Sequence, residues 1–209
     1  MLHLDIHMHL PCKYSRRSAV EIETAACELL QRFQPDIFRV VSSFDVENFF
    51  DVELHADTHI EAIYSDLPDG LEGFTDSLNM QCFISQKLAD HGGRDVQARR
   101  LRSTIAHEIG HCYLHVEEAR QNRQFQQMFK NDASFSFEMY RPEDLKAYEN
   151  PEWQAWRFAS ALLMPEPPFR CAVDRNWTKT QIKHGFDVNP SFIDVRLREL
   201  KITKSIRNG

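Results

Sequence analysis

The feature that most constrains this chain is a His-Glu-x-x-His pattern, in which His107 and His111 stand four residues apart and Glu108 follows the first. In an α-helix each residue turns about 100°, so positions i and i+4 lie one turn apart on the same side. Two imidazoles placed in this way can both reach one metal ion, and the glutamate lies on a flank where it can accept a proton from water. Because five residues can match by chance, the rest of the chain must be consistent with this interpretation.

The pattern lies within a segment that predicts one helix, from about residue 95 to residue 116. Its apolar positions fall within roughly 40° of one line at 100° per residue, and they are Leu101, Ile105, Ile109, Cys112 and Val116. The two histidines fall on nearly the opposite side. That side is either a solvated surface or the lining of a cleft, and the pattern is consistent with both.

Length and charge indicate one domain that does not bind nucleic acid in a general way. The 209 residues suffice for a single domain with a sizeable core. We expect that core over about residues 18–176, followed by a C-terminal helical hairpin at 177–209. The net charge of −6 argues against strong direct nucleic-acid binding, which needs a basic surface to neutralise phosphates.

Cysteine usage and hydropathy favour a cytoplasmic location. The five cysteines are odd in number and form no Cys-x-x-Cys pair, which argues against a disulfide framework or a cysteine zinc knuckle. No apolar stretch is long enough to span a bilayer, and the N-terminus lacks a basic segment followed by an apolar core. We therefore expect no membrane association.

The region before the central helix predicts an α+β fold. Ser18 and Glu21 form a capping-box pattern at the start of a helix that Pro35 ends. A short second helix is expected near residues 46–50. Short strands are expected at 52–56, 60–65 and 80–85. The expected class is a mostly helical α+β fold with a small antiparallel sheet before the central helix.

Residues 2–10 alternate strictly between apolar and polar side chains, which predicts a half-buried strand. Its polar side carries Asp5, His7 and His9, and this spacing resembles the stretch that opens metal-dependent amidohydrolase-type barrels. Such barrels need far more chain and further ligands after later strands, so a polar strand face is favoured. A small-molecule metal hydrolase that uses these three residues is kept as an alternative.

Beyond the central helix, residues 117–148 form the least regular region, rich in Gln and Phe. It is interpreted as a flap over a cleft, a partner surface or an insertion with its own small core. A helix with Asn150 as N-cap and Pro151 at its first position then runs to about residue 164. Glu152 lies on its apolar side, where a buried carboxylate needs a partner such as a metal. A first-turn glutamate that only complements the helix dipole is the other interpretation.

The tail predicts two short helices, at about 178–184 and from Pro190 to Leu200 with Asn189 as N-cap. Four basic residues make it locally positive: Arg196, Arg198, Lys201 and Lys204. A helix–turn–helix that binds DNA is one interpretation, and a packing hairpin is favoured.

Three stretches resemble the ImmA/IrrE family of metallopeptidases. Residues 100–115 resemble its active-site helix, which runs approximately T-x-A-H-E-[LI]-G-H-x-x-L-H. Residues 152–165 resemble its second signature, E-x-x-A-N-x-F-A-x-x-L-L-M-P, and residues 186–200 are similar to its closing F-x-V-S…R-L-x-x-L. The resemblance extends over roughly residues 18–200. Trp156 stands where asparagine is usual, and Asn189 where serine is usual.

The resemblance implies a zincin-like core of the gluzincin type with one zinc ion. Matched position by position, His107 and His111 are zinc ligands, Glu152 is the third ligand, and Glu108 is the catalytic base. A fourth position on the ion would stay open for water, as a catalytic zinc requires.

Three further residues are candidates to donate a hydrogen bond to the oxyanion, namely His115, Tyr113 and Tyr140, and the sequence does not rank them. His115 matches a common family histidine and is interpreted as supporting or structural. The longer zinc motif with a third histidine needs glycine at 114 and histidine at 117, where this chain has Leu114 and Glu117, so that class is excluded.

By this resemblance the chain is a zinc-dependent endopeptidase that hydrolyses peptide bonds in an intracellular protein. Family members typically cleave a helix–turn–helix repressor, in mobile elements or stress responses. The expected substrate is therefore a DNA-binding repressor, and the expected outcome is a change in transcription. The alternative is a non-catalytic, zinc-containing binding module that sequesters a regulator.

Overall fold

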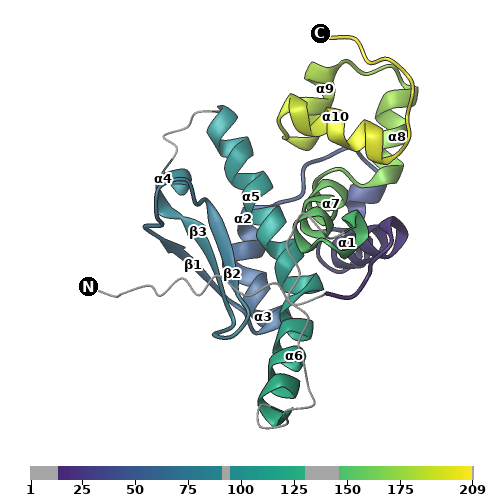
Figure 1. The fold of residues 1–209 in the computed structure, drawn as a ribbon. Helices are drawn as coiled ribbons and strands as arrows, with labels where there is room; N and C mark the ends of the chain where they lie inside the picture. Colours follow the sequence, from purple (N-terminus) through teal and green to yellow (C-terminus); the bar gives the residue numbers. More distant parts are fainter. Residues whose placement is uncertain (1–13, 91–94, 130–145, 209) are drawn as a thin grey trace.

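The computed structural model describes residues 14–90, 95–129 and 146–208, and it confirms the mostly helical α+β class. Helix α5 (Asp95–Leu114) runs through the middle of the molecule, with the small sheet on one side and helices α1 and α7 on the other (Figure 1). The predicted Asp5, His7 and His9 pattern and Tyr140 lie outside the described residues. Within the described ranges, no helix combines the length and apolar character of a membrane span.

Helix α1 (Ala19–Phe33) begins with the predicted capping box. The Glu21 backbone N–H donates to Ser18 Oγ at 3.2 Å, and the Ser18 N–H donates to the Glu21 carboxylate at 2.7 Å. Its buried face consists of Ile22, Ala26, Leu29 and Leu30. A short 3₁₀ helix, η1 (Pro35–Phe38), follows directly.

The predicted strand at 52–56 is wrong, because residues 46–58 are helical throughout. They form α2 (Val46–Asn48), a π-helical turn η2 (Phe49–Glu53) and α3 (Leu54–Thr58). The buried residues recur at helical spacing, at Val46, Phe49, Phe50 and Leu54. Asp45 caps the start by accepting from the Asn48 N–H.

The sheet has three strands in the order β1-β3-β2. The predicted strands at 60–65 and 80–85 are confirmed as β1 (Glu61–Ser65) and β3 (Gln81–Ser85), whereas β2 (Gly73–Asp76) was not predicted. Because β1 pairs with β3 in parallel and β2 pairs with β3 antiparallel, the sheet is mixed rather than antiparallel. Strand β2 has only four residues, too few for a clear alternation. Helix α4 (Gln86–Ala89) follows β3.

The region predicted to be irregular begins with a helix. Helix α5 ends at Leu114, and α6 (Val116–Phe129) extends beyond it away from the sheet (Figure 1). Residues with high helix propensity fill the first turns of α6, which explains a helix without a strong apolar stripe. A 3₁₀ turn, η4 (Ala147–Glu149), leads into the next helix.

Helix α7 (Pro151–Leu163) starts where the sequence predicts, with Asn150 Oδ1 accepting from the backbone N–H groups of the next turn. Helix α8 (Glu166–Asp174) was not predicted. Its prolines lie in the first turn, where no intrahelical N–H is needed. Helices α9 (Lys179–Phe186) and α10 (Pro190–Glu199) complete the chain.

Arg196, one of the four basic residues of the tail, does not lie on the surface. Its side chain is fully buried, Nε donates to the Met164 carbonyl at 2.8 Å, and the guanidinium forms an ion pair with Glu23 of α1. This pairing ties α10 to the body of the fold.

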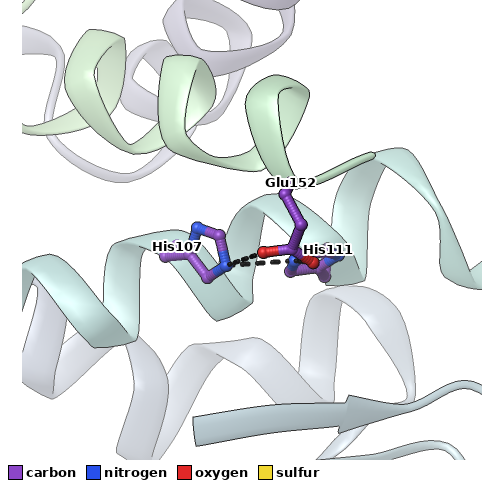
Figure 2. A group of neighbouring side chains, drawn as sticks. All are labelled: His107, His111 and Glu152. Atoms are coloured by element: carbon purple, nitrogen blue, oxygen red, sulfur yellow. Dashed lines mark hydrogen bonds and ion pairs between the residues drawn. The ribbon is translucent and has the colours of Figure 1, made fainter. Parts of the chain in front are cut away.

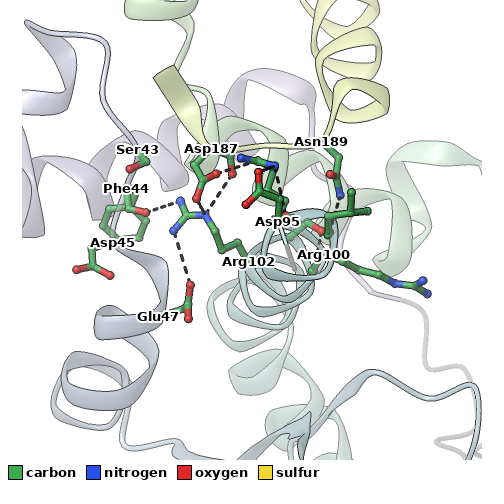
Figure 3. Close-up of polar contacts among 12 residues, drawn as sticks. Ser43, Phe44, Asp45, Glu47, Asp95, Arg100, Arg102, Asp187 and Asn189 are labelled. Atoms are coloured by element: carbon green, nitrogen blue, oxygen red, sulfur yellow. Dashed lines mark hydrogen bonds and ion pairs between the residues drawn. The ribbon is translucent and has the colours of Figure 1, made fainter. Parts of the chain in front are cut away.

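Two buried arginines anchor the N-terminal half of α5. Arg102 donates to the Phe44 carbonyl at 2.8 Å, and its Nε lies 3.3 Å from Asp187 Oδ2 (Figure 3). Arg99 Nε lies 2.9 Å from the other oxygen of the same carboxylate. Arg99, Arg102 and Asp187, here called the arginine cluster, join α5 to the α9–α10 connection.

Candidate metal centre

Helices α5 and α7 bring together His107, His111 and Glu152, here called the triad (Figure 2). The Nε2 atoms of the two histidines lie 3.1 Å apart. One Glu152 carboxylate oxygen lies 3.3 Å from His107 Nε2, and the other lies 3.3 Å from His111 Nε2. Within the described residues, His, Cys, Asp and Glu side chains come together in a group that could hold a metal ion at the triad, where the ligand atoms all lie within 4.8 Å of one another.

Gly110 sets the distance between the two helices. A Cβ atom at this position would lie 3.0 Å from the Ala155 carbonyl oxygen and 3.1 Å from the Ala155 Cα, closer than a side chain normally packs against backbone. The missing side chain lets α7 approach α5 and carries Glu152 to the imidazoles. The packing role of Gly110 depends on α7, 45 positions away at Ala155, and therefore leaves no local pattern in the sequence.

The triad is buried at His107, half-buried at His111 and open at its carboxylate. His107 is 7% exposed, whereas the Glu152 side chain is 64% exposed. The prediction that Glu152 faces a buried seam is therefore wrong, because its side chain stays largely exposed where it contacts the two imidazoles. Contact with the imidazoles of His107 and His111 still holds the pKa of the Glu152 carboxyl well below its usual range. Burial lowers the pKa of His111. Contact with Glu152 and the negative charge of Glu108 together outweigh burial, so the pKa of His111 lies above its ordinary value.

Glu108 lies beside the triad and is held by strand β2. Its carboxylate accepts a hydrogen bond from Thr75 Oγ1 at 2.8 Å. A Cβ atom at Gly73 would lie 2.9 Å from Glu108 Cγ and 3.1 Å from the Phe83 carbonyl oxygen, so the strand can pack here only without a side chain. Burial raises the pKa of Glu108 above its usual value. Sequence reasoning missed Thr75 and Gly73 because it missed β2.

A family model described as Peptidase_M78, the IrrE N-terminal-like domain, matches residues 94–198. This chain belongs to that family. The matched range includes both α5 and α7, and therefore the whole triad and Glu108. The predicted ImmA/IrrE resemblance is confirmed, and it places the chain in a family of metallopeptidases.

Among solved structures, this Peptidase_M78 chain is similar to a Mycobacterium tuberculosis transcriptional regulator. The TM-score is 0.55 at 15% sequence identity, and the match covers 90% of this chain and 49% of the regulator. At this identity the likeness concerns the fold, and the chain spans about half the length of that protein. No curated protein matches the sequence.

Trp156, the departure from the usual asparagine of the Peptidase_M78 signature, lies directly against a triad member. Its ring centroid is 4.2 Å from that of His107, and the Phe192 ring of α10 meets it edge-on with the centroids 6.3 Å apart. Trp156 is 44% exposed, so one part of its ring stays open to solvent beside the triad.

The structure separates the predicted oxyanion donors of this family member. His115 is buried behind His111, with the two Nδ1 atoms 3.1 Å apart, and burial lowers its pKa to about 3. Tyr113 does not reach the triad, since its hydroxyl donates to Asp57 and its ring stacks on Phe158 across the core. Tyr140 lies outside the described residues.

Proposed function

We propose that this chain is a zinc-dependent endopeptidase in which His107, His111 and Glu152 hold one zinc ion and Glu108 is the general base. The observation that carries the proposal is the convergence of two imidazole nitrogens and one carboxylate at 3.1 and 3.3 Å. Ligand atoms held about 2.0–2.1 Å from a tetrahedral ion lie about 3.3 Å from one another, so these donors fit zinc without rearrangement. Three protein ligands leave a fourth position for water, as in catalytic zinc sites.

When bound, zinc supplies Lewis acidity that activates water and polarises the scissile carbonyl. Glu108 then has a defined task. Thr75 holds one of its carboxylate oxygens. No hydrogen bond to the other oxygen is found within the described part of the chain, so that oxygen can accept a proton from water as the water oxygen attacks the carbonyl carbon. Glu108 passes that proton to the amide nitrogen as the C–N bond breaks, which releases a carboxylic acid and an amine.

We propose an intracellular DNA-binding repressor as the substrate, with altered transcription as the result. Membership of the Peptidase_M78 family supports a regulatory peptidase. The fold likeness to half of a protein described as a transcriptional regulator is compatible with a role beside such proteins.

The test compares the wild-type protein with Glu108→Gln, which keeps the shape and all three ligands. Both proteins are loaded with zinc and incubated with a lysate, and new peptide N-termini are labelled and sequenced by mass spectrometry. Both should contain about one zinc per chain, and only the wild type should generate new termini. Equal sets of termini from the two proteins would contradict the peptidase function and favour a module that binds without cutting.

A further inference from the structure

A line of buried polar groups continues from the back of His111 into the core. His111 Nδ1 lies 3.1 Å from His115 Nδ1, and His115 Nε2 lies 3.0 Å from Gln154 Oε1. His115 is 3% exposed and Gln154 is fully buried. Both ends of this line belong to the two helices that form the triad.

The orientation of the Gln154 amide is fixed by its surroundings. Its nitrogen donates to the Ser15 carbonyl at 3.1 Å and to the Tyr148 carbonyl at 2.8 Å. Backbone carbonyls only accept hydrogen bonds, so a flipped amide would place oxygen against two acceptors. The amide oxygen must therefore face His115, and His115 Nε2 must carry a hydrogen to donate to it.

The direction of the remaining bond follows. A neutral imidazole carries one N–H, so a His115 protonated at Nε2 can only accept at Nδ1. His111 must then donate from its Nδ1. A neutral His111 with hydrogen on Nδ1 has its lone pair on Nε2, the nitrogen that faces His107 and Glu152.

We propose that Gln154 and His115 are positioning residues that hold His111 in the tautomer whose Nε2 lone pair faces the other two triad members. Groups of this kind orient metal-binding histidines and commonly change metal affinity when they are replaced. The role toward zinc rests on the proposed function, whereas the tautomer of His111 is a property of the metal-free protein.

His107 provides an internal contrast. Its Nδ1 is buried and has no hydrogen-bond partner among the described residues. The chain therefore constrains the tautomer of one triad histidine and leaves the other without the same constraint.

The experiment records imidazole ¹H–¹⁵N long-range correlations in the metal-free protein, at a pH where the histidines are neutral. His111 in the wild type should show one tautomer, protonated at Nδ1. Gln154→Met keeps the side-chain length but removes the bond to His115, so His111 should become a mixture of tautomers. Zinc affinity, measured by competition with a chelator, should fall by about 10- to 100-fold.

Tyr113→Phe is the matched control, because it removes a different partly buried hydrogen bond from α5 and should leave both the His111 tautomer and zinc affinity unchanged. A wild-type His111 protonated mainly at Nε2 would overturn the proposal, and so would an unchanged tautomer in Gln154→Met. Since the tautomer is measured without metal, its outcome is separate from that of the Glu108→Gln test.

Discussion

Helix α5 carries two polar clusters, and they differ in how their charges are balanced. In the arginine cluster, two guanidinium groups share the Asp187 carboxylate, and Arg102 also donates to a backbone carbonyl. In the triad, two imidazole nitrogens and a carboxylate point toward one another, and each can act as an acceptor. The positive charges of the first arrangement are balanced within the protein, because Asp95 lies 3.4 Å from Arg99 and Glu47 lies 4.0 Å from Arg102. The second arrangement suits a cation held between its members.

This difference indicates that the arginine cluster stabilises the fold, whereas the triad serves the metal site. A buried, self-compensating pair is costly to break because the remaining partner stays desolvated. A group of converging acceptors at a half-open position can lose a member with little cost to the metal-free fold. Variants of the two clusters separate these roles.

Glu152→Ala should abolish tight zinc binding while leaving the metal-free fold intact. Removing one of three ligands should weaken zinc affinity by at least about 1,000-fold, equivalent to about 4 kcal/mol. The free energy of unfolding without metal should change by less than about 0.5 kcal/mol, because the side chain is 64% exposed. Chelator competition and urea denaturation measure the two quantities. A large loss of metal-free stability would remove the contrast with the arginine cluster.

Arg102→Ala should give the opposite result. It leaves the Phe44 carbonyl and part of the Asp187 carboxylate without a partner, so the free energy of unfolding should fall by about 3 kcal/mol. The folded fraction should still bind zinc with wild-type affinity. Arg100→Ala is the control, because its side chain is 60% exposed and its ion pair with Glu72 contributes at most about 1 kcal/mol. Equal destabilisation by Arg102→Ala and Arg100→Ala would contradict the role of the arginine cluster in stabilising the fold.

Stability should fall in mildly acidic solution because of His115. Burial lowers its pKa to about 3, against about 6.5 in the unfolded chain. Below about pH 6.5 His115 therefore binds a proton in the unfolded state but not in the folded state. The free energy of unfolding falls as the pH falls from about 6.5 toward 3. Between pH 7 and pH 5 the metal-free wild type should lose about 2 kcal/mol more than His115→Gln, as measured by urea denaturation. Parallel pH profiles would show that His115 does not carry this dependence.

Gly110→Ala should lower both the stability of the metal-free protein and its zinc affinity, because it changes the distance between α5 and α7. The new methyl group would meet the Ala155 backbone at about the distances already given, and overpacking of this kind costs about 1–2 kcal/mol after the gain in helix propensity. Movement of α7 should also displace Glu152 and weaken zinc binding. Ser103→Ala, on the more exposed side of α5, should change neither property, and thermal melting with zinc titration checks both variants.

The local signals in this chain were predicted correctly because their partners are close in sequence. Ser18 and Glu21 are three positions apart, and Asn150 caps the turn that follows it. His107 and His111 share a face because they are four residues apart on one helix. Such features need only the backbone geometry of one element.

The errors have the opposite character. Thr75 lies 33 positions before Glu108, and Glu23 lies 173 positions before Arg196, so neither contact leaves a local pattern. The same holds for the parallel pairing of β1 with β3 and for the helical form of residues 52–56, where packing outweighed strand propensity. The short helix predicted near residues 46–50 is confirmed.

Local sequence pattern is enough to predict the helix with two histidines on one face and the capped helix that carries Glu152, and the motifs indicate the family. Only the folded chain shows that Gly110 brings these helices together, that β2 holds Glu108, and that Gln154 faces His115. The physical reason is that periodicity fixes the direction of a side chain from its own helix, whereas distance and hydrogen-bond direction between two elements depend on what packs between them.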